Sequence, residues 1–191
     1  RCLTVVKDDP WLLFGGIIAI TNSQEQKATL GQRKEPNFLF ILTRQEFEQY
    51  IAQIIKILNH HEHFLVNRGM NHPVNDCEHG SFTSETDPFE IMFYANLIST
   101  YLYNTDRINE AERSAFQGAM MELLLNAVEH GNCNISYQEK TEWLKQGKDI
   151  LDLIRIKRMD PAIGKRKVLI TYDISPHRTR ITIKDDGEGF D

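Results

Sequence analysis

The chain has 191 residues, of which 41% are hydrophobic and 26% charged, and its formal net charge is -5. This composition excludes a generally disordered chain, because it holds ample apolar material for a core. The acidic excess argues against a nucleic-acid-binding face as the main function. The longest apolar run, Trp11 to Ile20, is about half of the ~20 residues that a membrane-spanning helix needs.

Two further features concern the origin of the chain. Its three cysteines are odd in number and widely spaced, which indicates reduced thiols in a cytoplasmic protein. The sequence opens on Arg1 and Cys2 without a Met, and no signal peptide is recognisable. We therefore expect a piece of a longer cytoplasmic protein.

The first third of the chain alternates predicted strands and helices. The expected elements are a strand over 16–21, a helix over 23–30, a strand over 38–42 and a helix over 44–59. Thr43 and Glu46 have the spacing of a capping box, in which each side chain bonds the other residue's N–H. The order of these elements predicts an α/β segment.

This order of elements resembles the C-terminal half of a response-regulator receiver domain. Thr43-Arg44 stands where the Lys-Pro of that family should follow the last strand. Asp8 and Asp9 lie too close upstream to supply a full acidic pocket. The resemblance implies that residues 1–66 are a partial, degenerate or truncated regulatory segment that docks and does not accept phosphate.

A second unit is predicted after a polar stretch. Residues 67–87 are rich in Asn, Gly, Ser, Thr and Pro, so we expect a linker or long loop there, with the domain boundary within 67–79. The first element expected after it is a helix over 89–103, capped by Asp87 and with Pro88 at its first position. A helix over 108–130 follows, and we expect Gly131 to stop it. The remaining expected elements are a short helix near 140–156 and the two strands of a hairpin over 167–174 and 180–184.

Polar residues follow one side of the predicted helix over 108–130. Near its end this helix is apolar except at Glu122, Asn126, Glu129 and His130. Residues four apart share a helix face, so Glu122, Asn126 and His130 form one line. A solvated stripe is one interpretation, but such a stripe usually contains Lys or Arg, and this one has none. A carboxylate, an amide and an imidazole without a cation suit a metal ion and its ligand.

The last predicted strand runs into Asp185-Asp186-Gly187-Glu188-Gly189. Glycine at such a turn lets the backbone approach a flat ligand and adopt conformations closed to other residues. A carboxylate at the strand end can accept a hydrogen bond from an exocyclic amine. An EF-hand is excluded because no alternating acidic ladder precedes the glycine. A P-loop and a Rossmann loop are excluded because their fingerprints are absent.

Glu-x-x-x-Asn on a helix, followed by a hairpin that ends in Asp-x-Gly-x-Gly, resembles the ATP-binding domain of the GHKL superfamily. That superfamily includes histidine kinases, anti-sigma-factor serine kinases and type II topoisomerases. The resemblance covers 80–191 and implies an α/β domain of the α+β sandwich kind, with helices layered on a mixed sheet. The resemblance also implies that the lid that covers the triphosphate in this superfamily would follow after Asp191.

The resemblance also implies roles for individual residues. Asn126 would coordinate the Mg²⁺ that bridges the phosphates of ATP, and Glu122 would be the general base. Asp185 would bind the adenine amino group, with Gly187 and Gly189 letting the base approach. Mg²⁺ prefers oxygen ligands, few of them from protein. Phosphoryl transfer needs chiefly positioning and charge neutralisation.

The sequence from Asn126 to Gly131 is similar to the motif Asn-Ala-x-x-His-Gly, which closes this helix in the anti-sigma-factor kinase branch. The similarity implies that His130 belongs to the nucleotide site. Histidine kinases usually carry a basic residue at the position of Glu129. The resemblance implies an ATP-dependent serine/threonine kinase in signalling. One alternative is a histidine kinase ATPase core, with His60, His61 or His63 considered as phospho-acceptor, and another is a nucleotide-sensing module without turnover.

The same resemblance implies the partners. They are a protein substrate or regulator, such as a sigma factor, an anti-sigma antagonist or a response regulator, and a second copy of the chain. Neither nucleic acid nor a membrane is expected among them.

Overall fold

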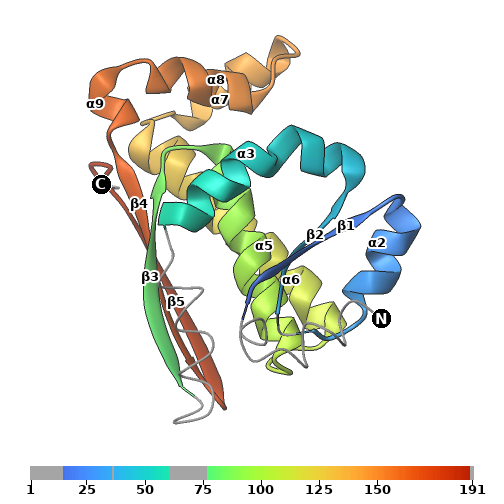
Figure 1. Cartoon of the computed structure of the whole chain (residues 1–191). Helices are drawn as coiled ribbons and strands as arrows, with labels where there is room; N and C mark the ends of the chain where they lie inside the picture. Colours follow the sequence, from blue (N-terminus) through green and yellow to red (C-terminus); the bar gives the residue numbers. More distant parts are fainter. Residues whose placement is uncertain (1–14, 36, 61–76, 190–191) are drawn as a thin grey trace. The chain divides into compact units, whose positions relative to one another are not determined.

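The computed structural model describes residues 15–35, 37–60 and 77–189 and shows a mixed α/β protein (Figure 1). The described residues form two compact units. The first contains those before His79 together with Asn96–Phe116, and the second contains His79–Ala95 and those from Gln117 onward. Helices α5 (Pro88–Asn104) and α6 (Glu110–Asn126) therefore contribute residues to both units. The predicted domain boundary within 67–79 stays a prediction.

The first unit contains a two-stranded parallel sheet. Strand β1 (Ile17–Thr21) pairs with β2 (Phe38–Thr43), and α2 (Gln24–Gly31) connects them. Helix α3 (Arg44–His60) follows β2 directly. The buried apolar side chains of these elements are Phe38, Leu39, Phe40, Leu42, Ile54 and Ile57. The predicted order of strand, helix, strand and helix is confirmed.

The capping box at the start of α3 forms as predicted. Glu46 N–H donates to Thr43 Oγ1 at 3.3 Å, and Thr43 N–H donates to Glu46 Oε2 at 2.8 Å. Lys27 on α2 adds hydrogen bonds from Nζ to both carboxylate oxygens of Glu46, each at 2.7 Å. Glu46 thus closes the N-terminus of α3 and ties α2 to it.

The second unit contains a three-stranded sheet with the order β3-β4-β5. Strands β4 (Lys167–Ser175) and β5 (Arg178–Asp185) form the predicted antiparallel hairpin, with Val168 opposite Asp185. Figure 1 shows the three strands side by side.

Strand β3 (Glu78–Glu85) corrects the prediction of a loop over 67–87. Its Gly-, Ser- and Thr-rich composition is typical of loops, but it buries alternate residues around Phe82. The Phe82 ring lies with its centroid 5.0 Å from that of Tyr94 and 5.4 Å from that of Tyr172. A Cβ at Gly80 would lie 2.2 Å from Tyr172 Oη, so a side chain there would have to displace the tyrosine ring.

The helices of the second unit also differ in part from their prediction. Asp87 caps α5 as expected, because Phe89 N–H donates to Asp87 Oδ1 at 2.9 Å. Helix α6 continues into a π-helical turn, η1 (Ala127–Asn132), and passes through Gly131. The prediction that Gly131 stops the helix is wrong: Cys133 is the C-cap, and Asn134 after it has φ of 50°.

The segment between η1 and β4 forms three helices where one was predicted over 140–156. These are α7 (Tyr137–Lys145), α8 (Ile150–Arg158) and the single turn α9 (Pro161–Gly164). Gly147, with φ of 71°, separates α7 from α8, and the Asp149 side chain caps α8 by accepting from Leu151 N–H. We call Tyr137–Gly164 the helical insertion. No helix in the described ranges is both long and apolar enough to cross a bilayer.

Replacing Glu46 by Gln should lower the free energy of unfolding by about 0.5–1 kcal/mol at neutral pH, because the neutral amide loses the ion pair with Lys27 and the favourable charge at the helix N-terminus. Partial burial favours the neutral acid, but the hydrogen bonds from Lys27 and Thr43 outweigh it and lower the pKa of Glu46. This stabilisation is therefore present above the unfolded pKa and lost as pH falls through the lower folded pKa.

Urea unfolding of wild type and Glu46→Gln at about pH 7 and about pH 3 measures this difference. We expect the two proteins to converge in acid, where position 46 is neutral in both. A difference that persisted unchanged in acid would contradict the electrostatic explanation.

Candidate functional site

The π-helical turn η1 packs against the end of β5, and this contact joins the two motifs singled out in the sequence. A Cβ built on Gly131 would lie 2.4 Å from Asp185 Cγ and 2.5 Å from its Oδ1. A Cβ on Gly187 would lie 2.5 Å from the Gly131 carbonyl oxygen. The backbone contact leaves no room for a side chain at Gly187, and a side chain at Gly131 would have to displace the Asp185 carboxylate.

Asp185 ends β5 with its carboxylate over Gly131. Its Oδ1 accepts a hydrogen bond from Gly187 N–H at 2.9 Å, which fixes the turn. A carboxylate has about four acceptor sites, so one bond leaves capacity for a further donor. Gly189 lies beyond it at φ of 83°, a conformation that favours glycine, with open space around its Cα.

Asn132 is a residue that the sequence interpretation missed. Its side chain is fully buried, its Oδ1 accepts from Asp186 N–H at 2.9 Å, and its Nδ2 donates to Thr86 Oγ1 at 2.9 Å. Its carbonyl oxygen accepts from Arg166 at 2.7 Å. Asn132 thus holds the Asp185–Gly187 turn in place. A buried Asn directly after His-Gly was the signal available, but its partners lie 46 and 54 residues away.

The polar line predicted along the helix is modified by η1. Glu122 and Asn126 lie on α6 and are exposed, and neither bonds a described residue. In the π-turn, Cys133 N–H donates to the Val128 carbonyl, five residues back. The π-turn contains an extra residue, which rotates the helix faces that follow Asn126. His130 therefore no longer lies on the same helix face as Glu122 and Asn126, and Gly131 lies closer to that face.

His130 is held by the backbone. Its Nδ1 lies 2.6 Å from the carbonyl oxygen of Ile135, which can only accept, so Nδ1 donates this hydrogen bond. Its neighbour Glu129 is buried and forms an ion pair with Lys140 of the helical insertion. The acidic residue at this position therefore supports the structure around η1.

Cys133 closes η1 and is fully buried. Burial raises the pKa of its thiol to about 11, so the thiolate is scarce at neutral pH. This supports a structural role for Cys133.

The donor set near η1 suits a magnesium ion shared with phosphates better than a protein-only metal site. The described residues contain no cluster of three or more His, Cys, Asp or Glu side chains able to hold a metal ion. Asn126 offers an exposed amide oxygen, and the exposed carboxylate of Glu122 lies one helical turn away. Mg²⁺ is usually bound by one or two protein oxygens with substrate phosphates and water, so Asn126 alone fits such a site.

Two hollows in the described structure lie elsewhere. One, of about 560 Å³, is lined by Thr21, Ser23 and neighbouring residues of α2. The other, of about 490 Å³, lies on the sheet between His79, Asp173 and Arg180. Neither is lined by Glu122, Asn126 or Asp185. These two hollows therefore do not belong to the candidate site around η1 and the end of β5.

The structure does not bear on the other histidines that were considered from the sequence. His61 and His63 lie outside the described residues, and His60 is the last residue of α3. Cys77 and His79 belong to no metal cluster in the described ranges.

Comparison with known proteins gives no match: neither the family models, nor the curated proteins, nor the solved structures contain a significant relative of this chain.

Two Gly→Ala substitutions should have opposite effects on stability. Gly131→Ala places a methyl group on the Asp185 carboxylate and should lower the free energy of unfolding by about 1–3 kcal/mol. Gly118→Ala is the matched control, because Gly118 lies in α6 with nothing within 4 Å of its Cβ. It should raise the free energy of unfolding by about 0.5–1 kcal/mol. Urea unfolding of both variants measures this, and equal effects would contradict the close packing of η1 on β5.

Proposed function

We propose that the second unit is an ATP-binding domain of the GHKL type, and that the protein is an ATP-dependent serine/threonine kinase of the anti-sigma-factor type in signalling. The observation that carries this proposal is the contact of Gly131 with the Asp185–Gly187 turn. It joins the end of the Glu-x-x-x-Asn helix to the Asp-x-Gly-x-Gly turn, as a single nucleotide site requires.

Asp185 has the geometry of an adenine anchor. Its Oδ1 is oriented by Gly187 N–H, and the carboxylate retains acceptor capacity for an exocyclic amine. The Asn132 amide and the Asp186 N–H hold the turn rigid, which reduces the ordering cost of binding. Gly187 and Gly189 present no side chain that would block a flat base.

Glu122 and Asn126 would serve the phosphate end. Bound Mg²⁺ would neutralise charge on the phosphates, and Asn126 Oδ1 is the protein oxygen that would hold it. Glu122 is one turn away and exposed, so its carboxylate is free to accept the proton of an attacking hydroxyl. The role of His130 is narrower: with Nδ1 bound to the backbone, only Nε2 is available to a nucleotide.

The serine kinase branch is favoured by Glu129. Where histidine kinases usually carry a basic residue, this chain has a buried carboxylate in an ion pair with Lys140. The ion pair supports η1 and leaves no cation at this position to meet the nucleotide.

Asp185→Asn should weaken binding of Mg²⁺·ATP by about tenfold or more, because the amide replaces a charged acceptor that the adenine amine requires. Isothermal titration calorimetry measures this. Glu188→Gln is the matched control, since it removes a neighbouring exposed carboxylate in the same turn and should bind as wild type. Absence of ATP binding by wild type, or equal loss in both variants, would argue against the adenine anchor.

Glu122→Ala should leave ATP binding within about twofold of wild type and abolish phosphoryl transfer, because a general base acts after binding. Radiolabel transfer from ATP to candidate protein partners measures this in the longest available form of the protein. Glu142→Ala, an exposed carboxylate on α7, should retain transfer. The stability of the product phosphate to acid and alkali distinguishes phosphoserine from phosphohistidine. Binding without any transfer would favour a nucleotide-sensing module.

A further inference from the structure

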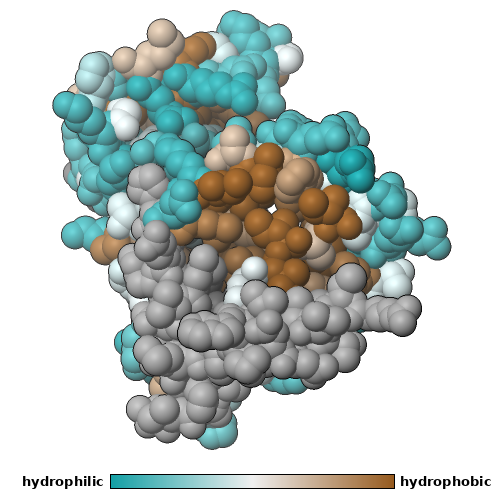
Figure 2. All heavy atoms as spheres, in the orientation of Figure 1, coloured by the Kyte–Doolittle hydropathy of each residue, from teal (hydrophilic) through white to brown (hydrophobic). Residues whose placement is uncertain are grey.

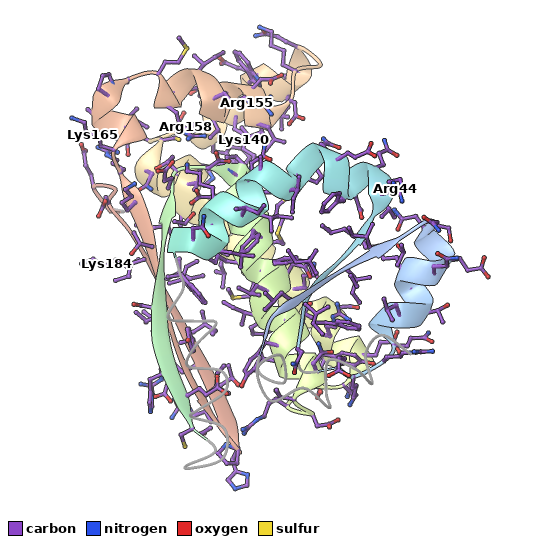
Figure 3. All side chains as sticks on the ribbon, viewed as in Figure 1. Arg44, Lys140, Arg155, Arg158, Lys165 and Lys184 are labelled. Carbon is purple, nitrogen blue, oxygen red and sulfur yellow. The ribbon has the colours of Figure 1, made fainter. Side chains whose placement is uncertain are left out.

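The helical insertion supplies one charged side chain to η1. Lys140 of α7, labelled in Figure 3, forms an ion pair with Glu129, and among the described residues the Glu129 carboxylate bonds Lys140 alone. The two partners differ in exposure: the Glu129 side chain is 3% exposed and that of Lys140 is 30% exposed. Lys140 can therefore leave the pair for water, whereas Glu129 would keep a buried charge without a partner. An uncompensated buried charge is strongly destabilising.

Helix α7 itself is weakly attached to the rest of the second unit. None of its nine side chains, all within the described residues, is buried, and Tyr137 and Leu144 are 81% and 48% exposed. In Figure 2 the visible surface of the insertion is mainly hydrophilic, with isolated apolar side chains. A helix this short is marginal without apolar packing. Helix α7 therefore belongs to the parts of the fold that open locally at low cost.

The chain on both sides of α7 is held firmly. Before α7, Ile135 is 1% exposed, and both its N–H and its carbonyl group bond residues of η1. After α7, helix α8 buries Leu153 and Ile154, and Arg158 pairs with Asp87 at 3.0 Å. Helix α7 can therefore open between two fixed points while α8 stays in place.

A displacement of Glu129 would reach the end of β5. Gly131 lies two residues further along η1 and contacts the Asp185–Gly187 turn. Asn132, the next residue, accepts from Asp186 N–H at 2.9 Å. A buried carboxylate that moves toward water after losing its partner has to move these neighbours, because η1 is a single turn. Opening of α7 and opening of the candidate site are therefore coupled.

We propose that α7 is a conformational switch for the candidate site. In the docked state Lys140 compensates the charge of Glu129, and η1 holds the Asp185–Gly187 turn closed. In the released state Glu129 is uncompensated and the turn opens. A regulator that binds released α7 would thereby open the turn without contacting it. This coupling needs no nucleotide, and only its effect on ATP binding rests on the proposed function.

Amide hydrogen exchange, followed by NMR, tests the coupling. Lys140→Met should raise the exchange rates of the Asp186 and Gly187 N–H groups at least about tenfold, while amides in the middle of the β4–β5 hairpin keep the wild-type rates. Lys140→Arg keeps the charge and should match wild type. Lys145→Met is the matched control, because Lys145 lies on the same helix, is exposed and forms no ion pair with a described residue.

A neutral residue at position 129 distinguishes a switch from a purely structural ion pair. Glu129→Gln leaves no buried charge, so the turn should stay closed while the amides of α7 exchange faster, because the ion pair is lost. The double variant Glu129→Gln/Lys140→Met should restore wild-type exchange in the turn. If the double variant exchanged there as fast as Lys140→Met, the proposal would be wrong.

Three further results would overturn the proposal. They are unchanged exchange of the turn in Lys140→Met, an equal rise across the β4–β5 hairpin, and an equal effect of Lys145→Met. Calorimetry with Mg²⁺·ATP is the arm that rests on the proposed function: Lys140→Met should weaken binding severalfold, and the double variant should restore it. If wild type binds no ATP, the exchange rates still decide on the switch, so the two proposals fail separately.

Discussion

The arrangement of the candidate site depends on one buried side chain. The amide of Asn132 accepts from Asp186 N–H and donates to Thr86 Oγ1, and Thr86 in turn donates to the Arg166 carbonyl at 2.8 Å. These bonds join the helix end, the loop after β3, the start of β4 and the end of β5. A buried amide whose partners are removed costs about 1–3 kcal/mol per unsatisfied group. Loss of any one of these bonds would therefore be costly.

The π-helical turn is the second constraint. An α-helix that continued to Asn132 would present different residues to β5, whereas the bond from Cys133 N–H to the Val128 carbonyl adds a residue to the turn. That rotation brings Gly131 onto the Asp185 carboxylate and leaves Asn126 on an exposed helix face. This single π-helical turn therefore places Gly131 against β5 and leaves Asn126 on the surface, where it would bind Mg²⁺.

Local patterns predicted much of the fold, and contacts distant in the sequence account for the rest. Thr43 and Glu46 identified their helix start because a capping box involves neighbours only. Strand β3 was missed because its partners lie on other elements and Phe82 is its only large apolar side chain. The approach of a ligand to the glycines after Asp185 stays a prediction, and the sequence could not show that the Gly131 carbonyl lies against Gly187.

The burial of Cys133 makes the C-cap of η1 a chemical reporter of local motion. Its thiol is covered in the closed structure, and burial raises the pKa to about 11, so alkylating reagents react slowly until the turn opens. The alkylation rate therefore reads out the free energy of local unfolding at η1 without a foreign label. Cys77 is partly exposed, so the reaction at Cys133 has to be measured apart from the reaction at Cys77.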